Sequence, residues 1–208
     1  MPRVTHVKRA RKDNPVCKKG ESYFWWKFRY GGKRYSLTRP RPSQLTRSAY
    51  YGTVRSLIEQ IEDSDVTSND DFLSLQDEIA SELANLLDET QGSLDNMPES
   101  LTYSPTGELL QERIDALEGA QDEVGDADEF EEDEPERDSF ISDCQECDGT
   151  GEVDEGEGDE ECSECKGEGT VDGEHEFQEA MSEWTDLKDD WSTTAKDELI
   201  EAVSACEV

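Results

Sequence analysis

The sequence predicts a multi-module α+β protein: a basic β-hairpin with a helix, a helical hairpin, an acidic disordered linker, a small four-cysteine ribbon and an acidic C-terminal helix. Three observations predict this organisation. Leu, Ile, Val and Phe supply 37 of the 208 residues and the net charge is −34, which is typical of a chain without one large core. Basic residues gather near the N-terminus, and four cysteines form two close pairs in the C-terminal third.

The charge is divided unevenly along the chain. Residues 1–56 hold fifteen Lys and Arg against two acidic residues, a net charge of +13, whereas the remainder carries −47. This asymmetry favours a basic module that binds a polyanion, attached to an acidic body. The low apolar content and the presence of only two histidines argue against an ordinary metabolic enzyme.

We expect a cytoplasmic location, in the host cell if the source is viral. No stretch approaches the roughly eighteen apolar residues of a membrane span. The basic first twelve residues lack the apolar core of a secretory signal. The six cysteines are therefore expected to be thiols or metal ligands rather than disulfides.

Residues 1–63 are predicted to form a hairpin followed by a helix. Two β-rich arms, Glu21–Tyr30 and Lys33–Thr38, flank a two-residue Gly31-Gly32 turn. Counting back from that turn pairs Tyr30 with Lys33, Phe28 with Tyr35 and Trp26 with Leu37. Alternation then gives an apolar face of Phe24, Trp26, Phe28, Tyr30, Tyr35 and Leu37.

A helix is expected to cover this face, because an isolated hairpin is barely stable in water. Ser43 is its predicted N-cap, and its apolar positions recur at helical spacing: Leu45, Tyr50, Val54, Leu57 and Ile61. Val4–Ala10 or Val16–Lys19 would supply a third strand.

The other side of the hairpin combines cations with aromatic rings. Lys33 falls on the apolar side in this register, but beside the turn its long stem can reach around to water. Cations neutralise phosphates and rings stack on exposed bases, so the predicted nucleic-acid-binding residues are Tyr23, Trp25, Lys27, Arg29, Lys33 and Arg34. The pattern WWKFRYGGKRYS followed by a helix resembles the arm-type DNA-binding domains of phage tyrosine recombinases, which lay a three-stranded sheet in a DNA groove. That resemblance implies that Lys27, Arg29, Lys33 and Arg34 face DNA. The alternative is a hairpin that docks on an acidic protein or on the chain's own tail.

Residues 64–120 are predicted to form a helical hairpin, or a coiled coil that makes a homodimer. Ser68 and Asn69 precede one apolar stripe, and a second stripe follows Pro105; together they contain Phe72, Leu75, Ile79, Leu83, Leu86, Leu87, Leu109, Leu110, Ile114, Leu117 and Val124. The segment NMPESLTYSPTGELLQERIDALE resembles one that recurs in uncharacterised phage and prophage proteins. That resemblance implies a viral source and no activity.

Residues 121–143 form the predicted acidic linker. Twelve of these 23 residues are Asp or Glu, and such a run repels itself and has little apolar surface to bury. We therefore expect disorder. The alternative is a nucleic-acid mimic whose carboxylates are spaced like phosphates.

Residues 144–172 carry the sharpest signal, two C-x-x-C pairs separated by fourteen residues. One tight turn aims both sulfurs of a pair at one ion, so Cys144, Cys147, Cys162 and Cys165 are predicted to bind one zinc ion tetrahedrally. The competing interpretation is a redox dithiol, but acidic neighbours disfavour the thiolate that redox chemistry requires. Cys17 and Cys206 are expected to be free, and the DEGEGDEE stretch at 154–161 is expected to be the solvated tip of the ribbon.

The two cysteine pairs are also internal repeats. CQECDGTGEV and CSECKGEGTV match at six of ten positions, and positive φ is expected at Gly149 and Gly167, which would turn backbone N–H groups toward the thiolates. This C-x-x-C-x-G-x-G repeat resembles half of the cysteine-rich zinc region of DnaJ-type co-chaperones. The His-Pro-Asp tripeptide of those proteins is absent from this sequence, so the resemblance implies the zinc site and not the co-chaperone activity.

Residues 173–208 are predicted to form an acidic amphipathic helix. Its apolar stripe is Phe177, Met181, Trp184, Leu187, Trp191, Ala195, Leu199 and Val203, with a break near Ser192. The stripe would dock on the ribbon or the helical hairpin, or would bind a partner.

Taken together, the sequence predicts a non-enzymatic nucleic-acid-binding accessory or regulatory protein that contacts DNA through its basic module. The ribbon or the C-terminal helix would recruit a protein partner. The alternative is a protein-only adaptor or inhibitor whose acidic body binds a basic or DNA-binding host protein.

Overall fold

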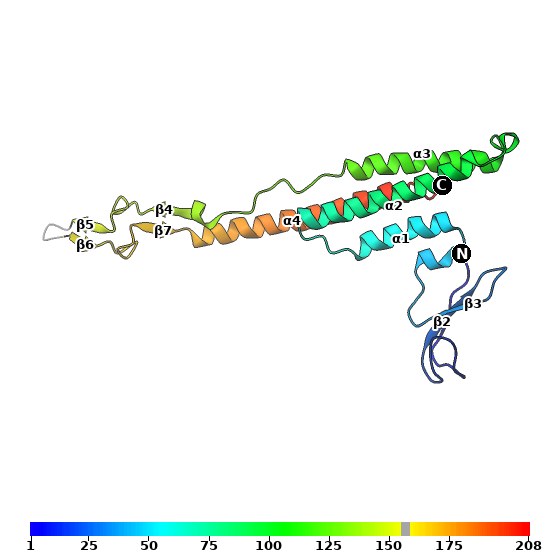
Figure 1. The fold of residues 1–208 in the computed structure, drawn as a ribbon. Coiled ribbons are helices and arrows are strands. Elements are labelled where there is room, and N and C mark those ends of the chain that lie inside the picture. Colours follow the sequence, from blue (N-terminus) through cyan, green and yellow to red (C-terminus); the bar gives the residue numbers. More distant parts are fainter. Residues whose placement is uncertain (155–158) are drawn as a thin grey trace. The chain divides into compact units, whose positions relative to one another are not determined.

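The computed structural model describes residues 1–154 and 159–208. These residues form an α+β structure with four α-helices, a three-stranded sheet and two two-stranded sheets (Figure 1). The chain divides into two compact units, which are considered separately: residues 1–129 with 194–208, and residues 130–193. No helix among the described residues is long and apolar enough to cross a membrane.

The basic sheet opens the first unit. Its strands are β1 (Thr5–Val7), β2 (Tyr23–Lys27) and β3 (Lys33–Ser36), all antiparallel in the order β1-β2-β3. The third strand predicted within Val4–Ala10 is therefore confirmed. The second candidate for that strand, Val16–Lys19, lies in the loop between β1 and β2.

The predicted register of the hairpin is wrong. Lys27 pairs with Lys33, Trp26 with Arg34 and Trp25 with Tyr35, so five residues rather than two connect the strands. Gly31 and Gly32 do not adopt the positive φ that a two-residue type I′ turn needs. Instead, a hydrogen bond fixes part of the longer loop: the Arg47 side chain donates to the Tyr30 carbonyl at 3.1 Å.

The new register redistributes the faces of the sheet, because directly paired residues share a face. Trp26 is buried at 4% exposure, as predicted, but Tyr30 and Leu37 are 72% and 57% exposed and lie outside the core. Tyr35 moves from the predicted apolar face to the face of Trp25.

A 3₁₀ turn (Pro42–Leu45) and helix α1 (Ala49–Asp63) follow the sheet. The N-cap of α1 is Ser48, whose hydroxyl accepts from the Tyr51 N–H at 3.4 Å. The predicted cap, Ser43, lies in the 3₁₀ turn, where its backbone N–H and hydroxyl donate to the buried carboxylate of Glu59 at 2.8 and 2.7 Å. The predicted buried face of the helix is confirmed at Tyr50, Val54, Leu57 and Ile61. Its main helical neighbour is α2 rather than the hairpin.

The helical hairpin consists of α2 (Asn69–Asp95) and α3 (Pro105–Gly125), joined through a short 3₁₀ turn (Glu99–Leu101). The two helices pack on each other, as Figure 1 shows. Most of both predicted stripes is buried: Phe72, Leu75, Ile79, Leu83, Leu86, Ile114, Leu117 and Val124. Leu87, Leu109 and Leu110 are only half-buried. Homodimerisation stays a prediction.

The acidic linker differs from the prediction at both ends. Helix α3 continues to Gly125, and a 3₁₀ turn (Arg137–Phe140) leads into strand β4 (Ile141–Asp143). Between them, the ring of Phe130 contacts Trp184 and Trp191, with centroids 5.9 and 5.5 Å apart. An aromatic residue within an acidic run can still bury its ring against other aromatic residues, which overrides the compositional expectation of disorder at this point.

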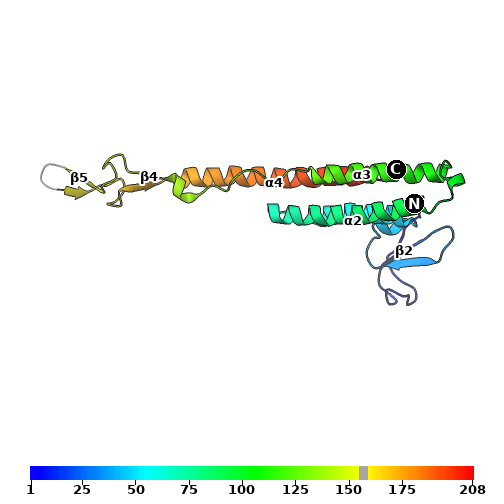
Figure 2. The same ribbon diagram turned by 45° about the horizontal axis from the view of Figure 1, so that its top comes forward.

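The ribbon contains β4, β5 (Glu152–Asp154), β6 (Asp159–Glu161) and β7 (Thr170–Asp172), with β4 paired to β7 and β5 to β6. The predicted acidic tip includes residues 155–158, which lie outside the described residues. Helix α4 (Glu174–Ser204) follows (Figure 2). Its bounds include Ser192, so the predicted break near that residue is absent.

The end of α4 belongs to the first unit and is part of its core. Ala195, Leu199, Val203 and Cys206 are buried. The Tyr50 hydroxyl donates to the Cys206 carbonyl at 3.0 Å, and the Lys196 ammonium donates to the Ser64 carbonyl at 2.7 Å. Docking of this part of the stripe inside the chain is therefore observed.

Candidate metal centre and nucleic-acid interface

The four predicted metal ligands meet at one point. The sulfurs of Cys144 and Cys162 lie 3.7 Å apart, as do those of Cys147 and Cys165, and all four lie within 4.8 Å of one another. All four side chains are buried. A tetrahedron with metal–sulfur bonds of about 2.3 Å has edges of about 3.8 Å. The quartet can therefore bind a metal ion with four sulfur ligands.

The backbone after each cysteine pair adopts a repeated conformation with positive φ. The first repeat has it at Asp148, Gly149 and Gly151, and the second at Lys166, Gly167 and Gly169. The prediction for Gly149 and Gly167 is confirmed. Backbone N–H groups turn toward the sulfurs, as predicted, but the sequence did not identify the donors: Gly151 donates to Cys147 Sγ at 3.2 Å and Gly169 donates to Cys165 Sγ at 3.3 Å. The second glycine of each repeat, Gly151 or Gly169, is the sequence signal that could have identified these donors.

The two repeats also bind each other reciprocally. The Cys144 N–H donates to the Gly169 carbonyl and the Cys162 N–H donates to the Gly151 carbonyl, both at 2.8 Å. A Cβ on Gly151 would lie 2.4 Å from the Gly167 carbonyl oxygen, and one on Gly169 would lie 2.4 Å from the Gly149 carbonyl oxygen. Only glycine permits this approach, which brings the two pairs of sulfurs together.

The electrostatics of the quartet favour a metal cation. Burial raises the pKa of the Cys144 thiol to about 12. Burial also opposes ionisation of Cys147, but the Gly151 N–H and the neighbouring thiols outweigh it and lower the pKa of Cys147 to about 7. Four buried thiolates would repel one another without a cation, so a metal ion is the group that stabilises the deprotonated set.

The two remaining cysteines lie apart from this centre. Cys17 is buried in the β1–β2 loop, where Asn14 Nδ2 approaches its sulfur at 3.2 Å. Cys206 is buried near α3, and its thiol lies 3.6 Å from the Ala116 carbonyl oxygen. Neither forms a disulfide.

The six predicted nucleic-acid-binding residues do not form one surface. Tyr23, Trp25, Lys27 and Lys33 share one face of the sheet, which we call the outer face. Arg34 pairs with buried Trp26 on the opposite face, where its guanidinium lies 5.3 Å from the Phe28 ring centroid.

Arg29 is in the loop, over the ring of Tyr30 at 5.2 Å. Tyr35 belongs to the outer face, whereas the register predicted from the sequence assigns it to the apolar face.

The outer face is both aromatic and cationic. The rings of Tyr23 and Tyr35 lie 6.0 Å apart at 42°, and Lys33 Nζ lies 4.4 Å from the Trp25 ring centroid. Residues 1–47 contain fourteen Lys and Arg. Of these, only Arg41 forms a salt bridge within the described ranges, with Asp63. The remaining cations are not neutralised by carboxylates of the described chain and keep their charge available to an external anion.

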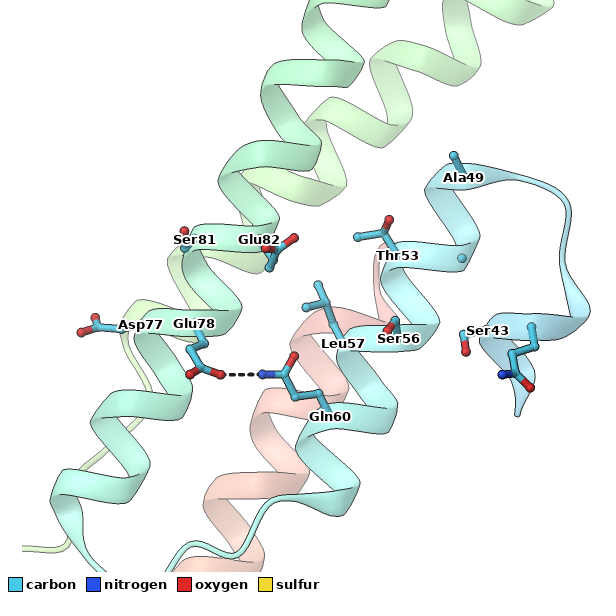
Figure 3. Close-up of a pocket in the computed structure, with 12 residues that line it drawn as sticks. Ser43, Ala49, Thr53, Ser56, Leu57, Gln60, Asp77, Glu78, Ser81 and Glu82 are labelled. Carbon is cyan, nitrogen blue, oxygen red and sulfur yellow. Dashed lines mark hydrogen bonds between the residues drawn. The ribbon is translucent and has the colours of Figure 1, made fainter. Parts of the chain in front are cut away.

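A groove in the first unit lies between α1 and α2 (Figure 3). Small side chains of α1 line one wall, including Ala49 and Thr53, while α2 contributes Asp77, Glu78 and Glu82. A hydrogen bond of 2.6 Å from Gln60 to Glu78 crosses it. The groove offers carboxylates, hydroxyls and amides, and it contains none of the predicted site residues.

Comparison of the chain with protein-family models, curated proteins and solved structures found no match. The resemblances noted from the sequence therefore stay predictions, and the function is argued from the two sites themselves.

Proposed function

We propose that this chain is a non-enzymatic nucleic-acid-binding accessory protein. Its basic sheet contacts the nucleic acid, and its four-cysteine ribbon is a structural element that carries an acidic surface for a protein partner. One observation carries the proposal: Lys27 and Lys33 pair across the strands on the same face as Tyr23, Trp25 and Tyr35. The cations can neutralise phosphates, and the partly exposed rings beside them can stack on bases.

Charge supports the same assignment. The net charge of +13 in residues 1–56 attracts a polyanion such as nucleic acid, whereas the net charge of −47 in the rest of the chain repels it. The basic module would therefore be the contact point, and binding would weaken as salt concentration rises.

Zinc is the metal we propose for the quartet. Tetrahedral four-sulfur sites suit zinc or iron, and a closed site without an open position suits a structural ion rather than a catalytic one. Elemental analysis of protein purified without chelator should find one zinc per chain. Iron in place of zinc would overturn the choice of metal. Metal-free protein with an intact fold would show that the four cysteines do not bind a metal ion.

A role for the ribbon in recruiting a basic protein follows from its charge. Residues 141–172 contain thirteen acidic residues and one lysine, so this surface would repel nucleic acid and attract a basic protein. In the alternative, a protein-only adaptor, the acidic surface of the ribbon binds the same kind of protein partner. The two proposals differ in the basic sheet, which binds no nucleic acid in the adaptor.

The experiment that tests the proposal is fluorescence anisotropy of the full-length protein with labelled DNA and RNA over a range of salt concentrations. Lys27→Gln with Lys33→Gln should weaken binding to every sequence and reduce the slope of log affinity against log salt by about two. The control, Lys166→Gln with Lys188→Gln, makes the same change of net charge at residues that are not part of the sheet and should leave both quantities unchanged. Absence of binding by the parent protein at low salt would favour the adaptor.

A further inference from the structure

We propose that the outer face of the basic sheet binds single-stranded nucleic acid, with unpaired bases stacked on Tyr23, Trp25 and Tyr35. This inference rests on the proposed function and narrows its ligand. The three residues are called the aromatic row below.

The aromatic row is continuous across two strands. Trp25 and Tyr35 are directly paired, and the ring of Tyr23 lies 6.0 Å from that of Tyr35. All three side chains are half-buried, so the sheet supports each ring while part of it stays exposed. Aromatic side chains arranged in this way on a sheet provide stacking surfaces for bases of any sequence.

Cations flank the row at both ends. Beyond Trp25, the Lys27–Lys33 pair continues the same face. Beyond Tyr23, its partner Val7 is followed closely by Arg9 and Arg11, which line a concavity together with Lys19. None of these five cations forms a salt bridge with another described residue. A strand that lies along the row would therefore meet positive charge on its phosphates at either end.

The row favours a single strand over a duplex for a steric reason. In a duplex the faces of the bases are stacked on each other, and only their edges are exposed in the grooves. Rings on a sheet have no base face to stack on unless the bases are unpaired. Reading of a groove would instead need polar side chains grouped on one face, yet Arg34 lies on the opposite face and Arg29 lies in the loop.

Lys33 would move when a base binds. Its ammonium lies 4.4 Å from the Trp25 ring centroid, over the surface on which a base would stack. The side chain is long and exposed, so a base can displace it toward a neighbouring phosphate. The same lysine then exchanges a contact with a ring for a contact with an anion.

The test compares full-length, metal-loaded protein on labelled oligo-dT, oligo-rU and a duplex of equal length, by fluorescence anisotropy. The single strands should bind more tightly than the duplex. Trp25→Ala should weaken single-strand binding by about 5- to 150-fold with the salt dependence unchanged, because it removes a stacking surface and no cation. Trp25→Phe should recover part of the loss, and Tyr103→Ala, at a side chain 90% exposed outside the sheet, should have no effect.

The outcomes separate this inference from the function on which it rests. A higher affinity for oligo-dT or oligo-rU than for the duplex supports the inference. Equal or tighter duplex binding that Trp25→Ala does not affect overturns the single-strand inference and leaves nucleic-acid binding in place. No binding of any of the three polymers overturns both. Circular dichroism of each variant shows whether the sheet is folded, and a folded Trp25→Phe with no recovery also contradicts stacking.

Discussion

Replacement of Trp26 by alanine should unfold the basic sheet, while replacement of its neighbour Trp25 should not. Trp26 is 4% exposed, and truncation of a large buried aromatic side chain costs about 3–5 kcal/mol. Trp25 is only half-buried on the outer face, so its truncation loses part of that packing together with a contact to Lys33 worth about 0.5–1 kcal/mol at an exposed site. Because a domain has only about 5–15 kcal/mol of stability, the first change is severe and the second is mild.

A third substitution separates packing from polarity at the same position. The indole N–H of Trp26 is buried without a hydrogen-bond acceptor among the described residues. An unsatisfied buried donor costs about 1–3 kcal/mol, so Trp26→Phe removes that penalty while it keeps most of the ring. Its stability should lie between those of the parent and Trp26→Ala.

Urea unfolding followed by circular dichroism, combined with trypsin cleavage of the lysine-rich N-terminal module, measures all three variants. Equal loss of stability in Trp25→Ala and Trp26→Ala would refute the assignment of the two faces.

The remaining predictions concern the ribbon and a helix terminus. Because the metal competes with protons for four thiolates, the zinc content should fall as pH falls. Cys162→Ser should release the metal at neutral pH, while a Cys17→Ser control keeps it. Elemental analysis after dialysis at each pH checks both expectations. Gly151→Ala should also prevent metal binding, since its Cβ would meet a carbonyl oxygen at 2.4 Å and its φ is +79°, whereas Gly125→Ala should not. Hydrogen bonds from Ser68 and Thr67 lower the pKa of Asp71, so its contribution to stability is present above the ordinary carboxyl pKa and is lost as pH falls through the lowered value. Thermal melts of Asp71→Asn and the parent should therefore differ at neutral pH and converge in acid.

Local chemistry was enough to predict that the four cysteine sulfurs meet at one point. The spacing of two cysteine pairs determines that each turn aims two sulfurs at one point, and this holds regardless of what surrounds the ribbon. The helical stripes were predictable for a similar reason, because residues such as Phe72, Ile79 and Leu117 recur with the helical period and are fully buried.

The register of the hairpin depended on a turn that the sequence only suggests. Gly31-Gly32 is compatible with a two-residue turn, but it is equally compatible with a longer loop, and three further residues in that loop change every cross-strand pair. Contacts between distant segments, such as that of Arg47 with the Tyr30 carbonyl, favour the longer loop, and no local pattern reveals them. The error moved Tyr35 off the outer face and placed Arg34 on it.

The position of Phe130 shows a further limit. Composition predicts disorder for an acidic run, yet one ring in that run packs near Trp184 and Trp191 of α4, and Trp184 donates its indole N–H to the Glu132 carbonyl at 3.1 Å. A partner more than fifty residues away along the chain cannot be identified from the composition of the linker.

Ultraviolet cross-linking of the full-length protein to a photoreactive single-stranded oligonucleotide, followed by mass spectrometry of the linked peptides, tests the central claim most directly. The account predicts cross-links at Tyr23, Trp25 or Tyr35, which competitor single strand suppresses and high salt weakens. Cross-links confined to residues outside 1–47, or none at low salt, would contradict it.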